Sequence, residues 1–149
     1  KCYKCFKRIA KIDIFHLSRE DYMSLNATWI EWINNLDATK WCVANFGVNN
    51  RRHKPFTVSI RMQVSGSPRY GEFNHIENTM VIFHNNCENV KLIVQTVLHE
   101  YTHYMQPIRS KYMELHERFS YEDNPLEVQA RTNERLYRNC WKKIKKNII

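Results

Sequence analysis

The sequence predicts an α+β fold in which a small β-sheet packs on an amphipathic helix and a further helix lies near the C-terminus. Residues 89–106 contain no Gly or Pro and repeat apolar side chains at helical spacing. Residues 56–64 and 79–84 are rich in β-branched and apolar residues, which favours strands. Asn124 followed by Pro125 is typical of the start of a long final helix. The segment between the last two helices is expected to be irregular.

In the first part of the chain, the sequence predicts one more helix and one more strand. Ser18 is followed by Glu20 and Asp21, an arrangement typical of a capped helix start. Residues 41–47 are expected to form a short strand. The apolar face of this first helix is formed by Tyr22, Leu25, Trp29, Trp32, Ile33 and Leu36.

Length and composition limit the classes of protein to which the chain can belong. With 149 residues, 43% of them apolar and only three Gly, the chain has the size and composition of one globular domain over residues 1–149. No apolar run approaches the about 18–20 residues that span a bilayer. The chain begins at Lys1 and not at Met, so residues 1–11 are interpreted as the end of a truncated upstream segment.

Residues 99–103 read His-Glu-Tyr-Thr-His and form the most informative motif. On a helix, His99 and His103 lie one turn apart on the same face, where two imidazoles can bind one zinc ion. Glu100 lies beside such an ion and can accept a proton from its bound water. This pattern is the signature of zinc proteases. The alternative is that the three residues are ordinary polar side chains on a helix.

A catalytic zinc site needs a third protein ligand. Glu127 is the favoured candidate, in the first turn of the final helix, although its spacing from Asn124 and Arg131 also fits a capping box and an ion pair. His116, thirteen residues after His103, is the alternative.

The pair of segments resembles the zincin metallopeptidases of the gluzincin type. Residues 127–130, Glu-Val-Gln-Ala, resemble the Glu-x-x-Ala segment of small, often phage-encoded ImmA/IrrE-like peptidases, and the likeness covers residues 79–138. It implies a zincin-like fold, with His99, His103 and Glu127 as ligands and Glu100 as the catalytic base. It also implies that the strand at 79–84 is an edge strand beside the cleft; an interior strand is the alternative, since the sequence does not settle the strand order. A weaker resemblance links residues 116–119 to SprT-like proteases, which usually carry a glycine that is absent here.

The expected activity is a zinc-dependent endopeptidase acting on a protein or peptide substrate, in which Glu100 activates water and then passes the proton to the leaving amine. Many such sites add a donor that stabilises the oxyanion. The candidates for this role are Tyr121, Tyr112, His116 and Arg131.

The cysteines and the charge leave further alternatives open. Cys2 and Cys5 form a Cys-x-x-Cys pair, which could belong to a second zinc site with His16 and Cys42 or to half of a zinc ribbon. Reduced thiols in the cytoplasm, or in the host cytoplasm if the protein is viral, are the simpler interpretation. The net charge is +8, and basic residues gather at both ends of the chain. A solvated surface is favoured over nucleic-acid binding.

Three functions therefore remain, besides another hydrolase reaction that uses the same metal chemistry. The favoured one is a small peptidase, with a phage origin suggested by the resemblance. The second is a DNA-associated, SprT-like protease that uses the basic termini. The third is an inactive zincin that serves as a binding module, against which the intact Glu100 argues.

Overall fold

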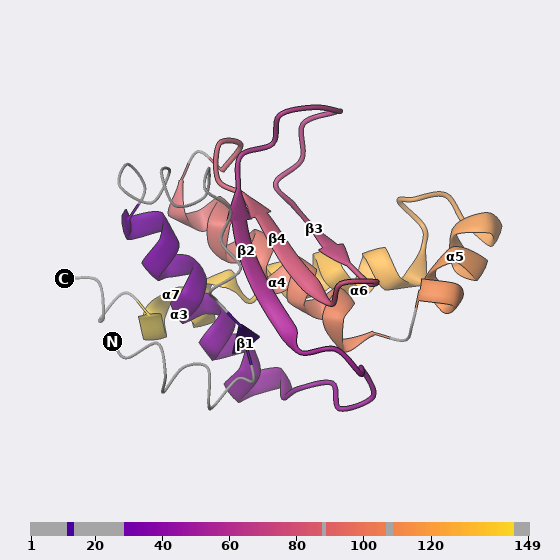
Figure 1. Ribbon diagram of the computed structural model, residues 1–149, viewed down its shortest axis with the longest axis horizontal. Helices are drawn as coiled ribbons and strands as arrows, with labels where there is room; N and C mark the ends of the chain where they lie inside the picture. Colours follow the sequence, from indigo (N-terminus) through magenta and orange to yellow (C-terminus); the bar gives the residue numbers. More distant parts are fainter. Residues whose placement is uncertain (1–11, 14–28, 88, 107–108, 145–149) are drawn as a thin grey trace.

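The computed structural model describes residues 12–13, 29–87, 89–106 and 109–144 (Figure 1). The predicted α+β class is confirmed, with a small sheet and helices in the order β1, α3, β2, β3, β4, α4, α5, α6, α7. The expected helix start at Ser18, and Cys2, Cys5 and His16, lie outside the described residues. The strands are β1 (Ile12–Asp13), β2 (Phe56–Arg61), β3 (Gly71–Asn74) and β4 (Thr79–Phe83), and the helices are α3 (Trp29–Phe46), α4 (Val90–Met105), α5 (Arg109–Arg118), α6 (Pro125–Glu134) and α7 (Tyr137–Ile144).

The sheet has the order β1-β2-β4-β3. β2 pairs in parallel with both β1 and β4, whereas β3 pairs antiparallel with β4. All five residues of β4 are buried, as expected of a strand with a neighbour on each side. The prediction that this strand forms the edge is therefore wrong. The edge on this side of the sheet, among the described strands, is β3, which the sequence did not predict.

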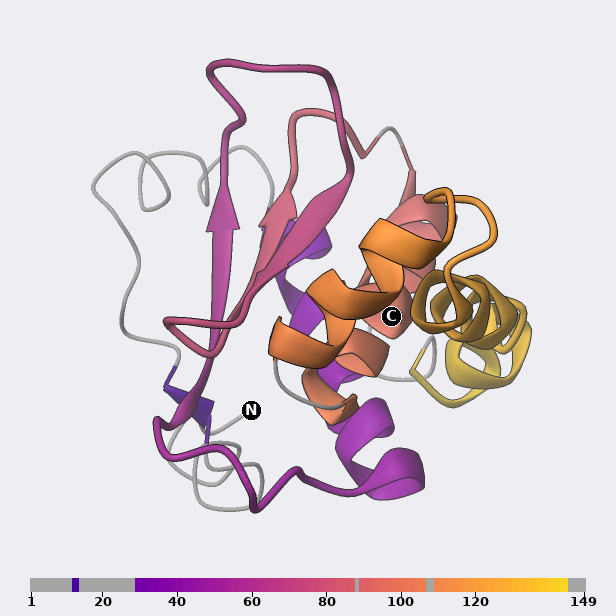
Figure 2. The same ribbon diagram turned by 90° about the vertical axis from the view of Figure 1, so that its right-hand side faces the viewer.

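Helix α4 forms the centre of the molecule and packs between the sheet and the other helices (Figure 2). Its predicted apolar stripe is confirmed, because Ile93, Val97 and Tyr101 are almost completely buried. Asn89 caps the helix by accepting a hydrogen bond from the backbone N–H of Leu92. The buried stripe holds α4 in one rotational orientation, with the opposite face left for polar residues.

A side chain from a distant loop holds the C-terminal end of α4. The guanidinium of Arg52 donates hydrogen bonds to the carbonyl oxygens of His103 (3.1 Å), Tyr104 (2.8 Å) and Gln106 (3.3 Å). Carbonyl groups at the end of a helix lack partners within the helix, so this contact satisfies them in a half-buried position.

The expected strand at 41–47 is wrong, because α3 continues through this segment. Ala38 and Cys42, four residues apart, are both fully buried on one face of the helix. The helix stops at Gly47, which has a φ of 79° and donates its N–H to the carbonyl oxygen of Val43. The segment is therefore helical, although its β-branched and aromatic residues favour a strand.

Two further differences concern the C-terminal part. The segment expected to be irregular contains α5, a polar helix whose Lys111 and Glu114 form an ion pair of 3.6 Å. An apolar stripe is the main helix signal, and α5 lacks one. The long final helix is two helices, because the chain turns at Arg135 and Leu136 between α6 and α7. Among the described helices, none combines the length and apolar character needed to cross a membrane.

Candidate metal centre

Helix α4 presents two imidazole rings on its polar face. His99 and His103 lie one helical turn apart, and their Nε2 atoms are 3.2 Å from each other. Both side chains are largely buried, with 13% and 8% of their surface exposed. The two rings therefore direct one nitrogen each toward a common point.

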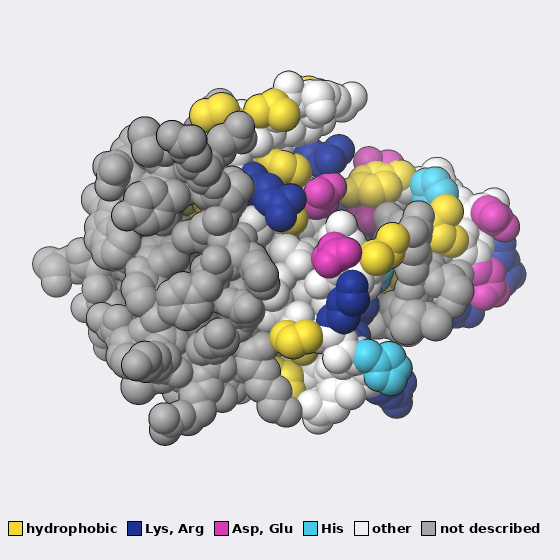
Figure 3. All heavy atoms as spheres, in the orientation of Figure 1, with side chains coloured by type: hydrophobic (Ala, Val, Ile, Leu, Met, Phe, Trp, Pro, Cys, Tyr) yellow, Lys and Arg dark blue, Asp and Glu magenta, His cyan; other side chains and the backbone are white. Residues whose placement is uncertain are grey.

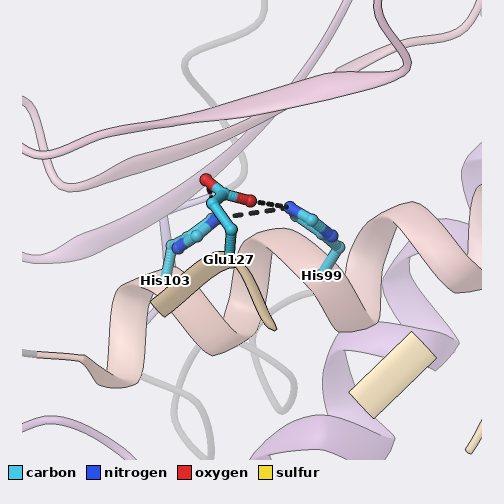
Figure 4. Close-up of side chains that lie close together, drawn as sticks. All are labelled: His99, His103 and Glu127. Carbon is cyan, nitrogen blue, oxygen red and sulfur yellow. Dashed lines mark hydrogen bonds and ion pairs between the residues drawn. The ribbon is translucent and has the colours of Figure 1, made fainter. Parts of the chain in front are cut away.

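Helix α6 brings a carboxylate to the same point (Figure 4). One oxygen of Glu127 lies 3.1 Å from Nε2 of His99, and the other lies 3.2 Å from Nε2 of His103. The ligand atoms of these three residues all lie within 4.8 Å of one another. The Glu127 side chain is 3% exposed, so its position comes from packing between helices.

The approach of Glu127 follows from the way α6 packs on α4. The Gln106 amide, just after the end of α4, donates to the carbonyl oxygen of Leu126 near the start of α6. Asn133, near the end of α6, donates to the hydroxyl of Thr102 within α4. These contacts show that the two helices run antiparallel. Asn124 caps α6 by accepting from the N–H of Leu126, so Glu127 lies in the first turn, where the helix dipole favours a carboxylate.

The second nitrogen of each ring also has a partner. Nδ1 of His99 lies 2.6 Å from a carboxylate oxygen of Glu134, and Nδ1 of His103 lies 2.8 Å from Oε1 of Gln106. The Gln106 amide donates in turn to Oε1 of Gln129. Contacts of this kind fix the tautomer and orientation of metal-binding imidazoles. Glu134 and Gln106 were not predicted, although Glu134 follows Glu127 by seven residues and so shares its helix face.

The neighbouring carboxylates control the protonation of the imidazoles. Burial lowers the pKa of His99, but hydrogen bonds to Glu127 and Glu134 outweigh burial and raise the pKa to about 10. The pKa of His103 is also raised, because its contact with Glu127 outweighs burial. The site therefore favours positive charge between Glu127 and the two rings.

Glu100 lies beside this cluster and is buried. Burial raises the pKa of its carboxyl group to about 7, against the opposing effect of His103 and His99. Glu100 lines the same pocket as His99, His103 and Glu127. Glu100 is therefore next to the three candidate metal ligands but is not one of them.

The other residues predicted for the site lie at different places in the structure, some in the pocket and some away from the cluster. Tyr121 lines the pocket and hydrogen bonds to Glu127; burial and this carboxylate raise the pKa of Tyr121 to about 12. Arg131 lines the neighbouring pocket and contacts Glu122 at 3.8 Å. His116 is exposed on α5 and does not join the cluster. The side chain of Tyr112 lies outside the described residues, and Cys42 is buried in α3.

The geometry of the three donors fits a tetrahedral zinc ion. Nitrogens about 2.0–2.1 Å from such an ion lie about 3.3–3.4 Å apart. The observed separation of 3.2 Å between the two Nε2 atoms is close to this value. Two histidines and one glutamate also form one of the known donor sets of catalytic zinc, which leaves a position for water or substrate.

No family model, curated protein or solved structure matches the chain.

Proposed function

We propose that the protein is a zinc-dependent endopeptidase with a zincin-like fold of the gluzincin type. The observation that carries this proposal is the convergence of His99, His103 and Glu127 beside a buried Glu100 in an open pocket. The ligand set, the adjacent carboxylate and the access for substrate are the three components that metal-assisted hydrolysis requires.

Each residue has a distinct role in the proposed chemistry. His99, His103 and Glu127 hold the ion, while Glu134 and Gln106 orient the two rings. A zinc ion held there would supply an acidified water and would polarise the carbonyl group of the substrate. Glu100 accepts a proton from the attacking water and delivers it to the leaving nitrogen. The Tyr121 hydroxyl, which hydrogen bonds to Glu127 in the structure, would turn from Glu127 to donate to the carbonyl oxygen as negative charge develops on that oxygen.

The edge of the sheet supports a peptide as the substrate. β3 borders the pocket through Gly71, Glu72, Phe73 and Asn74. An extended peptide can pair with the free edge of a strand and so bring its backbone alongside the pocket. This assigns to β3 the role that the sequence suggested for the strand at 79–84.

The test combines metal content with peptide hydrolysis. Purified protein should contain about one zinc per chain by elemental analysis and should cleave peptides from a mixed library. Glu100→Gln should retain zinc but lose about 10²–10⁴-fold in kcat, because it removes only the base. Glu117→Gln, at an exposed position on α5, is the matched control and should behave like the unmodified protein.

Two results would contradict the proposal. Normal turnover by Glu100→Gln would remove the assigned mechanism. Zinc-loaded protein that cleaves no peptide in the library would instead support the binding module, in which the same residues hold a metal without catalysis.

DNA-associated proteolysis is a second candidate that rests on a specific surface. The exposed basic residues on α7 and just before it are Arg135, Arg138, Lys142 and Lys143. Such a surface attracts phosphate groups. Salt-sensitive DNA binding that is weakened by Arg138→Ala and Lys142→Ala, together with DNA-stimulated hydrolysis, would favour this candidate.

A further inference from the structure

All three proposed zinc ligands line one pocket, and His99 also lines a second pocket that adjoins it. One pocket, of about 460 Å³, and a second, of about 630 Å³, share Gly71, His99, Glu100 and Tyr121. Because the two share these residues, they form the two halves of one cleft. A peptide lying across the site would therefore place residues on each side of the scissile bond in a different half.

The two halves present different side chains. The smaller half, which we call the apolar half, contains four large apolar side chains beside the proposed metal site: Phe73 of β3, Ile76 of the β3–β4 turn, Met113 of α5 and Tyr121. Polar residues, Glu72, Asn74 and His75, also line it. The larger half adds charged and amide side chains, including Arg69, Arg131, Glu122, Asn85 and Asn86, to Pro68 and Tyr70. Hydrophobic side chains lie beside charged ones over the described part of the face seen in Figure 3.

The apolar side chains are exposed although they are large. Ile76 is 62% exposed, Met113 is 41% exposed and Tyr121 is 51% exposed. They come from three separate segments and meet at one pocket. A group of exposed apolar side chains next to convergent polar groups is typical of a binding site for an apolar ligand group.

The pairing of β3 gives the direction of a bound peptide. The N–H of Phe83 donates to the carbonyl oxygen of Tyr70 at 2.8 Å. Hydrogen-bonded pairs alternate along an antiparallel ladder, so Glu72 bonds toward β4 while the backbone groups of Gly71 and Phe73 face the free edge. Antiparallel pairing is the more stable kind. A peptide paired in this way runs from the Phe73 end toward Gly71.

Gly71 marks where the peptide meets the catalytic residues. A Cβ atom at this position would lie 3.4 Å from Cγ of Glu100. The N-terminal part of the peptide, before the residue that lies opposite Gly71, lies along Phe73 and Ile76, in the apolar half. This part precedes the scissile bond.

We propose that the apolar half binds a large apolar side chain at one of the two substrate residues immediately before the scissile bond. The inference rests on the proposed function and names its substrate class as extended protein segments with Leu, Met or Phe before the cleaved bond. Ile76 and Met113 are the specificity-determining residues, and Tyr121 closes the pocket on the side of the metal.

The test measures cleavage preference and binding separately. Zinc-loaded protein is given paired peptides that differ only by Leu or Ser before the bond, and cut positions are read by mass spectrometry. The ratio of kcat/KM between the Leu and Ser peptides should be about tenfold or more. The double variant Ile76→Ser with Met113→Ser should bring this ratio close to one. The matched control, Met62→Ser with Val64→Ser, removes two exposed apolar side chains outside the cleft and should preserve the ratio.

A binding measurement keeps the inference separate from catalysis. Fluorescence anisotropy with the Glu100→Gln protein should show tighter binding of the Leu peptide, and the double variant should lose this difference. Hydrolysis without preference, or with an apolar preference only after the cleaved bond, overturns the inference and leaves the peptidase intact. Absence of hydrolysis overturns the proposed function, and equal binding of the two peptides then overturns the apolar pocket as well.

Discussion

Nδ1 of His99 lies 2.6 Å from a carboxylate oxygen of Glu134. This contact joins α4 to the C-terminal end of α6. Glu127, on the same face of α6 near its start, joins the same two helices. The imidazole of His99 is therefore held between two carboxylates of one helix, one on each ring nitrogen. Its orientation depends on the packing of α6 on α4.

Glu134→Ala should weaken zinc binding about 10–100-fold, because the His99 ring loses the partner that orients it. The affinity is measured by competition with a chromogenic chelator. Glu117→Ala on α5 is the matched control and should leave the affinity unchanged. Equal affinities for the two variants would show that the Glu134 contact does not position the ring.

Glu127→Ala should lose zinc much more readily than His116→Ala, since the structure places Glu127 and not His116 beside the two imidazoles. Elemental analysis of the purified variants after dialysis checks this prediction. The reverse order would move the third ligand to His116.

Arg52→Ala should lower the free energy of unfolding by about 1.5–3 kcal/mol, because a charged donor is removed from three helix-end carbonyl groups. Arg51→Ala, at the exposed neighbouring position, should change it by less than about 0.5 kcal/mol. Urea denaturation measures both values. Similar small losses in the two variants would rule out a stabilising role for the Arg52 contact.

Gly71→Ala should destabilise the protein by about 1–3 kcal/mol and reduce hydrolysis. The added methyl group would lie 2.7 Å from both Cγ2 of Thr96 and the carbonyl oxygen of Val81, and 3.4 Å from Cγ of Glu100. Thr96→Ser removes one of the two close contacts, so the double variant should recover part of the loss. Full stability in Gly71→Ala, by thermal denaturation, would show that β3 can move away at no cost.

The metal-free protein should become less stable as the pH rises. The pKa of His99 is raised from 6.5 to about 10 in the folded protein. Its contribution is therefore fully present below pH 6.5 and is lost as the pH rises through about 10. Urea midpoints at several pH values, with His99→Gln as the comparison, test this sign. A parallel decline in both proteins would assign the effect to other groups.

Much of the site could be predicted because it depends on local spacing. The apolar stripe of α4 places His99 and His103 on the opposite face, and the Asn124-Pro125 start places Glu127 in a first turn. Helical geometry alone produces both results. The same reasoning failed at residues 41–47 and in α5, where local composition and the absence of an apolar stripe gave a misleading signal.

The strand order could not be derived in this way. The apolar run in β4 is compatible with an edge or a central position until its neighbours are known, and the short, half-buried β3 carries no clear strand pattern. Long-range hydrogen bonds and packing settle which strand borders the cleft.

By itself, the sequence determined the α+β class, the helix that carries the two histidines, and the capped start that precedes Glu127, because each depends on contacts within a few residues. Only the tertiary structure decided that Glu127 and not His116 meets the histidines, that Glu134, Gln106 and Arg52 support them, and that β3 borders the cleft. These relationships join segments that are far apart in the chain, and they arise from the way the helices and strands pack together.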